Sequence, residues 1–130
     1  MLTKKPTILL ADDYPAMLKL LSVVLKSEGY QVVTARDSTT ILKLAKRRKL
    51  KHLVILELEA IEQQGIEVCR RLREFSDVPV IILAAKYNEQ DIVCGLEAGA
   101  DEFITKPFDI VEFVTRVKAV LRRYGFPELA

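Results

Sequence analysis

Short apolar runs alternate with helical patterns along the whole chain, and this alternation constrains the fold more than any other feature. The expected strands cover residues 7–11, 31–35, 53–56, 80–84 and 103–105. The expected helices follow them at about 15–28, 39–49, 89–98 and 109–124, with a further helix after Gly65. Strands that are apolar on both faces need helices on both sides, and parallel strands need crossovers that supply such helices. The pattern therefore predicts a doubly wound α/β domain with a parallel sheet.

Two local signals refine these expectations. Ser38 is expected to cap the second helix, and Phe75 is expected on the core face of the third helix with Val68 and Leu72. At 130 residues the chain fits one domain, which we place at residues 1–124, with 125–130 as a tail or the start of a linker.

Composition excludes several classes of protein. Half of the residues are apolar, so intrinsic disorder is excluded, and a net charge of +2 is too small to indicate nucleic-acid binding by bulk charge. No apolar run is long enough to span a membrane and no signal peptide is recognisable, so we expect a cytoplasmic protein without a membrane partner. Cys69 and Cys94 are expected to be buried free thiols on helices, and His52 to be a packing or surface residue.

Charged residues stand where the expected strands end. Asp12 and Asp13 follow the first strand, Glu57 the third, and Lys106 the fifth, while Ala84 ends the fourth. Doubly wound sheets bind and react at the carboxyl ends of their strands. We therefore expect three carboxylates and one ammonium group to meet at one edge of the sheet.

At this point the sequence resembles the CheY-like receiver domain of bacterial response regulators, from Ile8 to about Arg123. The matching segments are LLADD at 9–13, LVILELE at 53–59, VPVIILAA at 78–85 and GLEAGADEFITKPF at 95–108. The last segment is most similar to receivers of the winged-helix OmpR/PhoB branch. The resemblance implies a flavodoxin-like sheet of order 2-1-3-4-5 with five helices, and a role in two-component signal transduction.

The resemblance assigns a role to each residue at the strand ends. Asp12 and Asp13 match the acidic pair that holds Mg²⁺, and Lys106 matches the lysine that neutralises the phosphoryl group. Glu57 stands at the position of the phosphoaccepting aspartate, and Ala84 at that of a hydroxyl residue. Further implied features are the switch aromatic, Phe103, and a cis peptide bond before Pro107, whereas an ordinary proline would start the last helix in trans.

Both altered positions oppose phosphorylation. The Glu57 carboxylate extends about 1.5 Å farther than that of an aspartate, and a displacement near 1 Å costs on the order of 100-fold in rate. Ala84 provides no hydroxyl for a transferred phosphoryl oxygen. The longer glutamate also spoils one Mg²⁺ ligand position, so we expect weak or absent Mg²⁺ and no other cofactor.

Two interpretations of Glu57 remain open. In the first, its carboxylate contacts Lys106 and imitates the phosphorylated state; in the second, Glu57 is a drifted residue in a silent site. Phe103 is expected to lie inward over the small Ala84, an arrangement that plain core packing also produces.

The resemblance to the winged-helix branch implies a homodimer through helix 4, strand 5 and helix 5. Glu97 pairs with Lys118 in this arrangement, and Asp101 or Glu102 pairs with Arg116, across a two-fold axis. The alternative is that these are solvated helix charges, worth about 0–1 kcal/mol per pair.

The sequence thus predicts a non-enzymatic, phosphorylation-independent receiver that acts by protein contacts on an output such as transcription, in a fused or separate domain. Whether a histidine kinase is a partner stays open. The alternative is a conventional Mg²⁺-dependent switch that accepts phosphate on Glu57, Asp12 or Asp13. A hydrolase is disfavoured because the chain lacks a Gly-rich phosphate loop. The basic cluster at 43–52 is interpreted as a solvated helix end, not as a nucleic-acid site.

Overall fold

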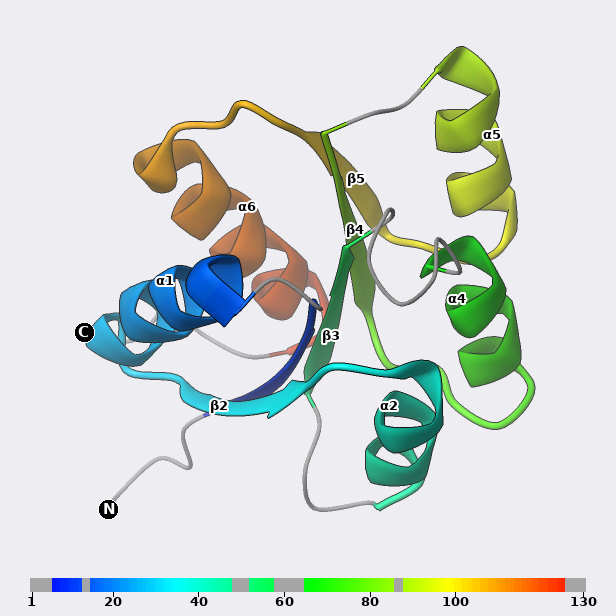
Figure 1. Cartoon of the computed structure of the whole chain (residues 1–130), viewed down its shortest axis with the longest axis horizontal. Helices are drawn as coiled ribbons and strands as arrows, with labels where there is room; N and C mark the ends of the chain where they lie inside the picture. Colours follow the sequence, from blue (N-terminus) through cyan, green and yellow to red (C-terminus); the bar gives the residue numbers. More distant parts are fainter. Residues whose placement is uncertain (1–5, 13–14, 48–51, 58–64, 86–87, 126–130) are drawn as a thin grey trace.

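The computed structural model describes residues 6–12, 15–47, 52–57, 65–85 and 88–125. Five parallel strands form one sheet in the order β2-β1-β3-β4-β5, which confirms the predicted fold class. The strands are β1 (Thr7–Ala11), β2 (Gln31–Ala35), β3 (Leu53–Glu57), β4 (Val80–Ala84) and β5 (Glu102–Thr105). The described helices are α1 (Pro15–Ser27), α2 (Ser38–Ala45), α4 (Gly65–Arg73), α5 (Glu89–Glu97) and α6 (Ile110–Arg123). Figure 1 shows α1 and α6 on one face of the sheet and α2, α4 and α5 on the other.

The sheet separates two hydrophobic clusters, one beneath each layer of helices. Alternate residues of β1, β3 and β4 point into opposite clusters, and these three central strands are buried along their whole length. The edge strands β2 and β5 are only partly buried. Full burial of the central strands explains why their sequences are continuously apolar and not alternating.

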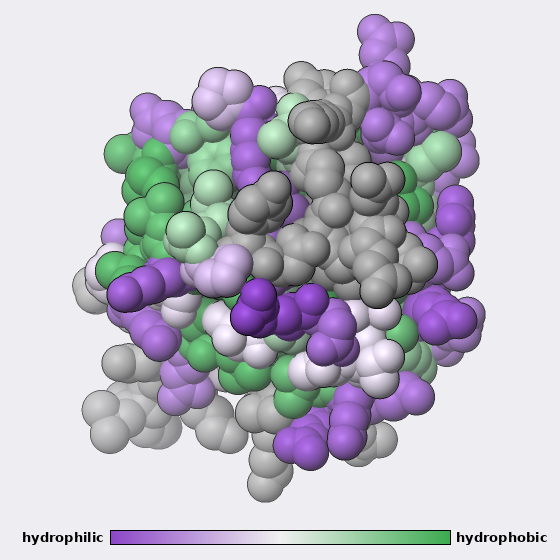
Figure 2. Space-filling view, in the orientation of Figure 1, coloured by the Kyte–Doolittle hydropathy of each residue, from purple (hydrophilic) through white to green (hydrophobic). Residues whose placement is uncertain are grey.

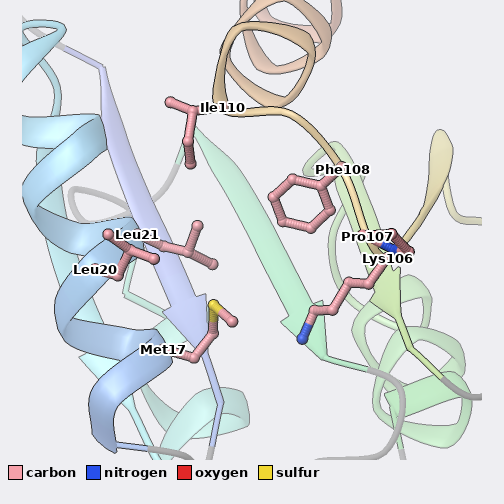
Figure 3. Close-up of a pocket in the computed structure, with 7 residues that line it drawn as sticks. All are labelled: Met17, Leu20, Leu21, Lys106, Pro107, Phe108 and Ile110. Carbon is pink, nitrogen blue, oxygen red and sulfur yellow. The ribbon is translucent and has the colours of Figure 1, made fainter.

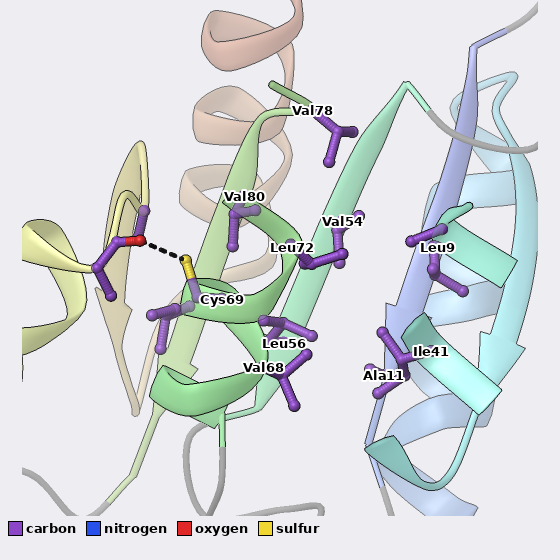
Figure 4. Packing of buried hydrophobic residues seen from close by; sticks show 14 of the residues in the cluster. Leu9, Ala11, Ile41, Val54, Leu56, Val68, Cys69, Leu72, Val78 and Val80 are labelled. Carbon is purple, nitrogen blue, oxygen red and sulfur yellow. Dashed lines mark hydrogen bonds between the residues drawn. The ribbon is translucent and has the colours of Figure 1, made fainter. Parts of the chain in front are cut away.

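Cys69 belongs to the cluster beneath α2, α4 and α5. Its thiol donates a hydrogen bond of 3.6 Å to the carbonyl oxygen of Ala98, which follows α5 (Figure 4). Burial raises the pKa of this thiol, so Cys69 is a packing residue with little thiolate character. Both cysteines are free, as expected, but only Cys69 is buried, whereas Cys94 is partly exposed.

Two local expectations are corrected by the structure. The N-cap of α2 is Asp37, whose carboxylate accepts the backbone N–H of Thr40 at 2.7 Å, and Ser38 is the first helical residue. This hydrogen bond lowers the pKa of the Asp37 carboxyl group. Phe75 lies beyond the end of α4 and is exposed, with the Lys46 ammonium 5.4 Å from its ring centre. An aromatic ring can satisfy a cation in this way without entering the core.

His52 has a structural role at the amino edge of the sheet. Its ring Nδ1 accepts the backbone N–H of Thr7 at 2.8 Å, and its own backbone N–H donates to the Thr7 carbonyl at 2.7 Å. These two bonds hold the start of β1 against the residue before β3. No helix in the described part of the chain is long and apolar enough to cross a membrane.

Arg73, the last residue of α4, joins several elements at the same edge. Its guanidinium donates to the carbonyl oxygen of Gly99 at 2.7 and 3.1 Å, and to that of Val78 at 2.6 Å. It also pairs with Asp101 at 3.2 Å, and the same Asp101 oxygen accepts the backbone N–H of Val80 at 2.8 Å. One planar guanidinium thereby connects the ends of α4 and α5 to the beginnings of β4 and β5.

Replacement of Arg73 should be costly for this reason. We expect Arg73→Ala to lower the free energy of unfolding by about 2–3 kcal/mol, because it removes the donor to the carbonyls of Gly99 and Val78 and the cationic partner of Asp101. Arg70→Ala is the matched control, since Arg70 lies in the same helix and forms an exposed pair with Glu67; its cost should stay within about 0.5 kcal/mol. Urea denaturation measures both, and equal losses would contradict the role of Arg73.

Candidate functional site

Asp12 and Glu57 lie side by side at the carboxyl edge of the sheet. In the parallel register of β1 and β3, Ala11 stands opposite Leu56, so the next residue on each strand is one of the two acids. The backbone N–H of Asp12 donates to Ala35 at 3.2 Å and continues the pairing with β2 by one residue. Asp12 is 1% exposed and Glu57 is 3% exposed. The fold thus places two carboxyl groups together in a buried position, where charge needs compensation.

Lys106 supplies a positive charge to this position. Its Nζ atom lies 2.6 Å from Oε1 of Glu57, so the expected contact between these residues is formed. The Lys106 side chain is 18% exposed and the Glu57 side chain 4%. In Figure 3 the Lys106 side chain runs from the segment after β5 to the carboxyl end of β3. The backbone N–H of Lys106 donates to Ala84 at 2.7 Å, and the Lys106–Pro107 peptide bond is cis, as the resemblance implied.

The ion pair fixes geometry more than it stabilises the fold. At an effective dielectric constant of about 20, two unit charges this close attract each other by about 4–6 kcal/mol. The desolvation of both groups offsets much of that attraction. What remains is a strong preference for one arrangement, because either charge would be costly in this environment without the other.

Asp12 and Glu57 fit Mg²⁺ in kind, since carboxylate oxygens are the hard ligands that this ion prefers. One oxygen of Glu57 is already engaged by an ammonium group. Among the described residues, no group of three or more His, Cys, Asp or Glu side chains forms a metal site. Asp13, the second member of the expected acidic pair, lies outside the described residues.

The residues near the end of β4 are small or apolar. Ala84 is fully buried and stands opposite Thr105 in the register with β5. Phe103 is half-buried, and its ring lies against Gly95 of α5 and Ile82 of β4. The ring therefore points toward the layer of α5, on the same face of the sheet as Ala84.

An apolar pocket adjoins the site on the opposite face of the sheet, between α1 and the segment that leads into α6 (Figure 3). Its lining residues are Met17, Leu20, Leu21, Lys106, Pro107, Phe108 and Ile110. Lys106 contributes its aliphatic stem to the pocket wall while its ammonium group turns to Glu57. In Figure 2 hydrophobic surface gathers on the left, over α1 and α6.

Several charges expected at a dimer interface form ion pairs within the chain. Arg116 pairs with Glu102 at 2.5 Å and with Glu112 at 3.2 Å, and Lys118 pairs with Glu28 at 2.9 Å.

Asp101, another of the expected interface residues, pairs with Arg73 and accepts the hydroxyl hydrogen of Tyr124. The bond to Asp101 raises the pKa of the Tyr124 phenol. Glu97 lies exposed on α5.

Sequence reasoning missed the roles of Arg73, Tyr124 and Gly95. An arginine at a helix end and a tyrosine after the last helix match no sequence motif. Only the three-dimensional structure shows that Arg73 contacts Gly99 and Asp101, and that Tyr124 contacts Asp101. The segments at 48–51 and 58–64, which carry part of the basic cluster and the altered loop after β3, lie outside the described residues.

A buried acid–lysine pair at the carboxyl edge of a 2-1-3-4-5 sheet is the arrangement that the sequence predicted for a receiver domain, and the family comparison agrees. The chain matches the response regulator receiver domain over residues 8–118. It therefore belongs to the receiver domains of two-component signalling, as the sequence predicted.

Two relatives and one solved structure show its place within the family. The chain is 42% identical over 121 residues to the DNA-binding response regulator MtrA of Mycolicibacterium smegmatis, covering 93% of this chain and 53% of that protein. It is 44% identical over 117 residues to the alkaline phosphatase synthesis transcriptional regulatory protein PhoP of Bacillus subtilis, covering 89% and 48%. The chain spans about half the length of these relatives. The non-phosphorylated HemR receiver domain from Leptospira biflexa has a TM-score of 0.81 and 31% identity, with 90% of this chain and 94% of that chain covered.

The burial of the ion pair predicts an asymmetric response to substitution. Lys106→Met should lower the free energy of unfolding by about 3–5 kcal/mol at neutral pH, because it leaves the buried Glu57 carboxylate uncompensated beside Asp12. Adding Glu57→Gln in the same chain should recover more than half of that loss. The control is Lys19→Met, which removes an exposed lysine of α1. A Lys106→Met variant as stable as this control in urea denaturation would show that the pair is not buried as described.

Proposed function

We propose that this chain is a receiver whose output-competent state does not depend on phosphorylation. The observation that carries this proposal is the contact of 2.6 Å between Lys106 Nζ and Glu57 Oε1. In the sequence resemblance, this lysine neutralises a phosphoryl group attached to an aspartate at the position of Glu57. Here the glutamate itself brings an anionic oxygen to the lysine, so the charge pairing of the modified state exists in the unmodified chain.

The arrangement also opposes phosphoryl transfer. A carboxylate oxygen must approach the phosphorus atom in line with the leaving group, and the transferred oxygens need nearby donors. One Glu57 oxygen is engaged by Lys106, the side chain is almost fully buried, and Ala84 offers a methyl group where a hydroxyl would donate. Glu57 is therefore a poor acceptor on geometric grounds.

A conventional Mg²⁺-dependent switch is the second candidate, and the adjacency of Asp12 and Glu57 favours it. If Mg²⁺ binds here, these two side chains would hold it, and the ion would supply charge neutralisation for an incoming phosphoryl group. We propose that binding is weak, because Lys106 already compensates Glu57.

Calorimetric titration tests the metal affinity. We expect a Mg²⁺ dissociation constant above about 1 mM for the wild-type chain, since the ion demands near-octahedral geometry and must compete with the ammonium group. Glu57→Asp should bind Mg²⁺ more tightly, because its shorter side chain frees the Lys106 contact. Sub-millimolar binding by the wild type would contradict the proposal.

The output is proposed to be transcriptional. Both relatives are regulators of transcription or DNA-binding proteins by name, and each is about twice as long as this chain. The receiver itself is proposed to act by protein contacts, without enzymatic activity and without direct contact to nucleic acid. Histidine-kinase control is not required by this mechanism.

The proposed contact surface is the face formed by α5, β5 and α6, through which two copies form a homodimer. These elements are the helix 4, strand 5 and helix 5 of the sequence prediction. Val93 and Leu96 of α5 and Val111 of α6 expose apolar side chains, and exposed charged residues lie near them. Because Arg116 and Lys118 already have partners within the chain, dimerisation exchanges ion pairs and adds few new ones. The dimer should therefore be weak and sensitive to salt.

Self-association of Glu57→Gln tests the coupling between the site and this face. We expect the substitution to lower the dimerisation constant by about 5-fold or more, a typical coupling between two sites, because it removes the anion that holds Lys106. Light scattering at low and high salt gives the constants. Asp77→Asn is the control, since it removes the same charge from an exposed position. An unchanged dimerisation constant for Glu57→Gln would contradict the proposal that Glu57 imitates the phosphorylated state.

A further inference from the structure

Helix α5 lies on the sheet through a glycine. Gly95 is the buried residue of this helix, whereas Val93 and Leu96 on either side of it are exposed by 45% and 48%. Each of the other helices buries at least one bulky apolar side chain. In α5 the helix backbone at Gly95 packs directly against the sheet.

The ring of Phe103 lies directly beneath this glycine. A Cβ atom at Gly95 would lie 3.1 and 3.3 Å from two ring carbons of Phe103, and 3.2 Å from Cδ1 of Ile82. Carbon atoms normally approach to about 3.5–4.0 Å. Phe103 and Ile82 stand opposite each other in the β4–β5 register, so together they form the floor on which α5 rests.

Backbone conformation does not explain this glycine. The glycines with positive φ in the described part of the chain are Gly29, Gly99 and Gly125, so Gly95 has a conformation open to any residue. In a helix interior, glycine lowers the folding equilibrium about fivefold relative to alanine. The steric contact with the ring is the feature that distinguishes this position.

We propose that Gly95 is a positioning residue that forms the seat for the Phe103 ring, and that the ring in this seat sets the distance between α5 and the sheet. If the Phe103 ring moved away from Gly95, α5 would lose one of the two side chains on which it rests. The exposed Val93 and Leu96 then move with the helix, because they lie on its outer side next to Gly95. The seat is a packing device and holds whether or not the receiver is independent of phosphorylation.

The test combines Gly95→Ala with Phe103→Leu in a double-mutant cycle. Alone, Gly95→Ala should fail to give the fivefold gain in folding equilibrium expected for an ordinary helix position, because the added methyl group meets the ring. In the Phe103→Leu background the same substitution should be more favourable than in the wild type, since the two ring contacts are removed and only the contact with Cδ1 of Ile82, the end of a flexible side chain, remains. Glu97→Ala, at an exposed position of α5, is the control and should have the same effect in both backgrounds.

Heteronuclear NMR gives a second readout that does not require Gly95→Ala to fold. In the wild type the Hα signals of Gly95 should carry a ring-current shift from Phe103, and Phe103→Leu should remove it and move the amide signals of residues 89–97. A Gly95→Ala gain of about fivefold in both backgrounds would overturn the proposal. Amide changes confined to the immediate neighbours of residue 103, with α5 unaffected, would overturn it as well.

Discussion

The contact between Glu57 and Lys106 is the interaction on which the carboxyl edge of this domain depends. Glu57 ends β3 and Lys106 follows β5, so the pair reaches across the end of β4, which lies between them. The residue that ends β4 is Ala84, whose small side chain is fully buried. The long side chains of Glu57 and Lys106 therefore meet across the end of β4, where the residue is the small Ala84.

Chemistry and packing are separated along the sheet. The carboxyl edge holds the buried acids and Lys106, whereas the amino edge is held by His52 and by the hydrogen bonds of Arg73. Between the edges, the apolar strands form two clusters that need no polar groups. The site can therefore change its charges without loss of the fold, provided that the buried charges remain balanced. This separation explains how a receiver can keep its architecture with a buried glutamate at the end of β3.

The sequence predicted the architecture because its signals are local and redundant. Continuous apolar strands such as 53–56 and 80–84 cannot be covered except by helices on both faces, and the strand ends then identify the site without any structure. The Glu57–Lys106 contact was predictable for the same reason, since the parallel sheet brings these strand ends together.

Other features were not predictable, and the reason is physical. Ser38 and Asp37 are both good caps, and only the backbone angles decide between them. The stripe of α4 extends to Phe75 in sequence, but the helix ends at Arg73 and the ring turns to Lys46 instead. The partners of Arg73 and the seat at Gly95 depend on segments that are distant in sequence, where spacing carries no signal.

The most direct test of a receiver that works without phosphate is the intact mass of the protein after incubation with acetyl phosphate and Mg²⁺. Glu57→Asp/Ala84→Thr, which restores a shorter acid and a hydroxyl group, serves as the positive control and should gain about 80 Da, the mass of one phosphoryl group. The mass of the wild-type chain should stay unchanged under the same conditions. A wild-type chain that becomes about 80 Da heavier at Glu57 would contradict a receiver that is independent of phosphorylation.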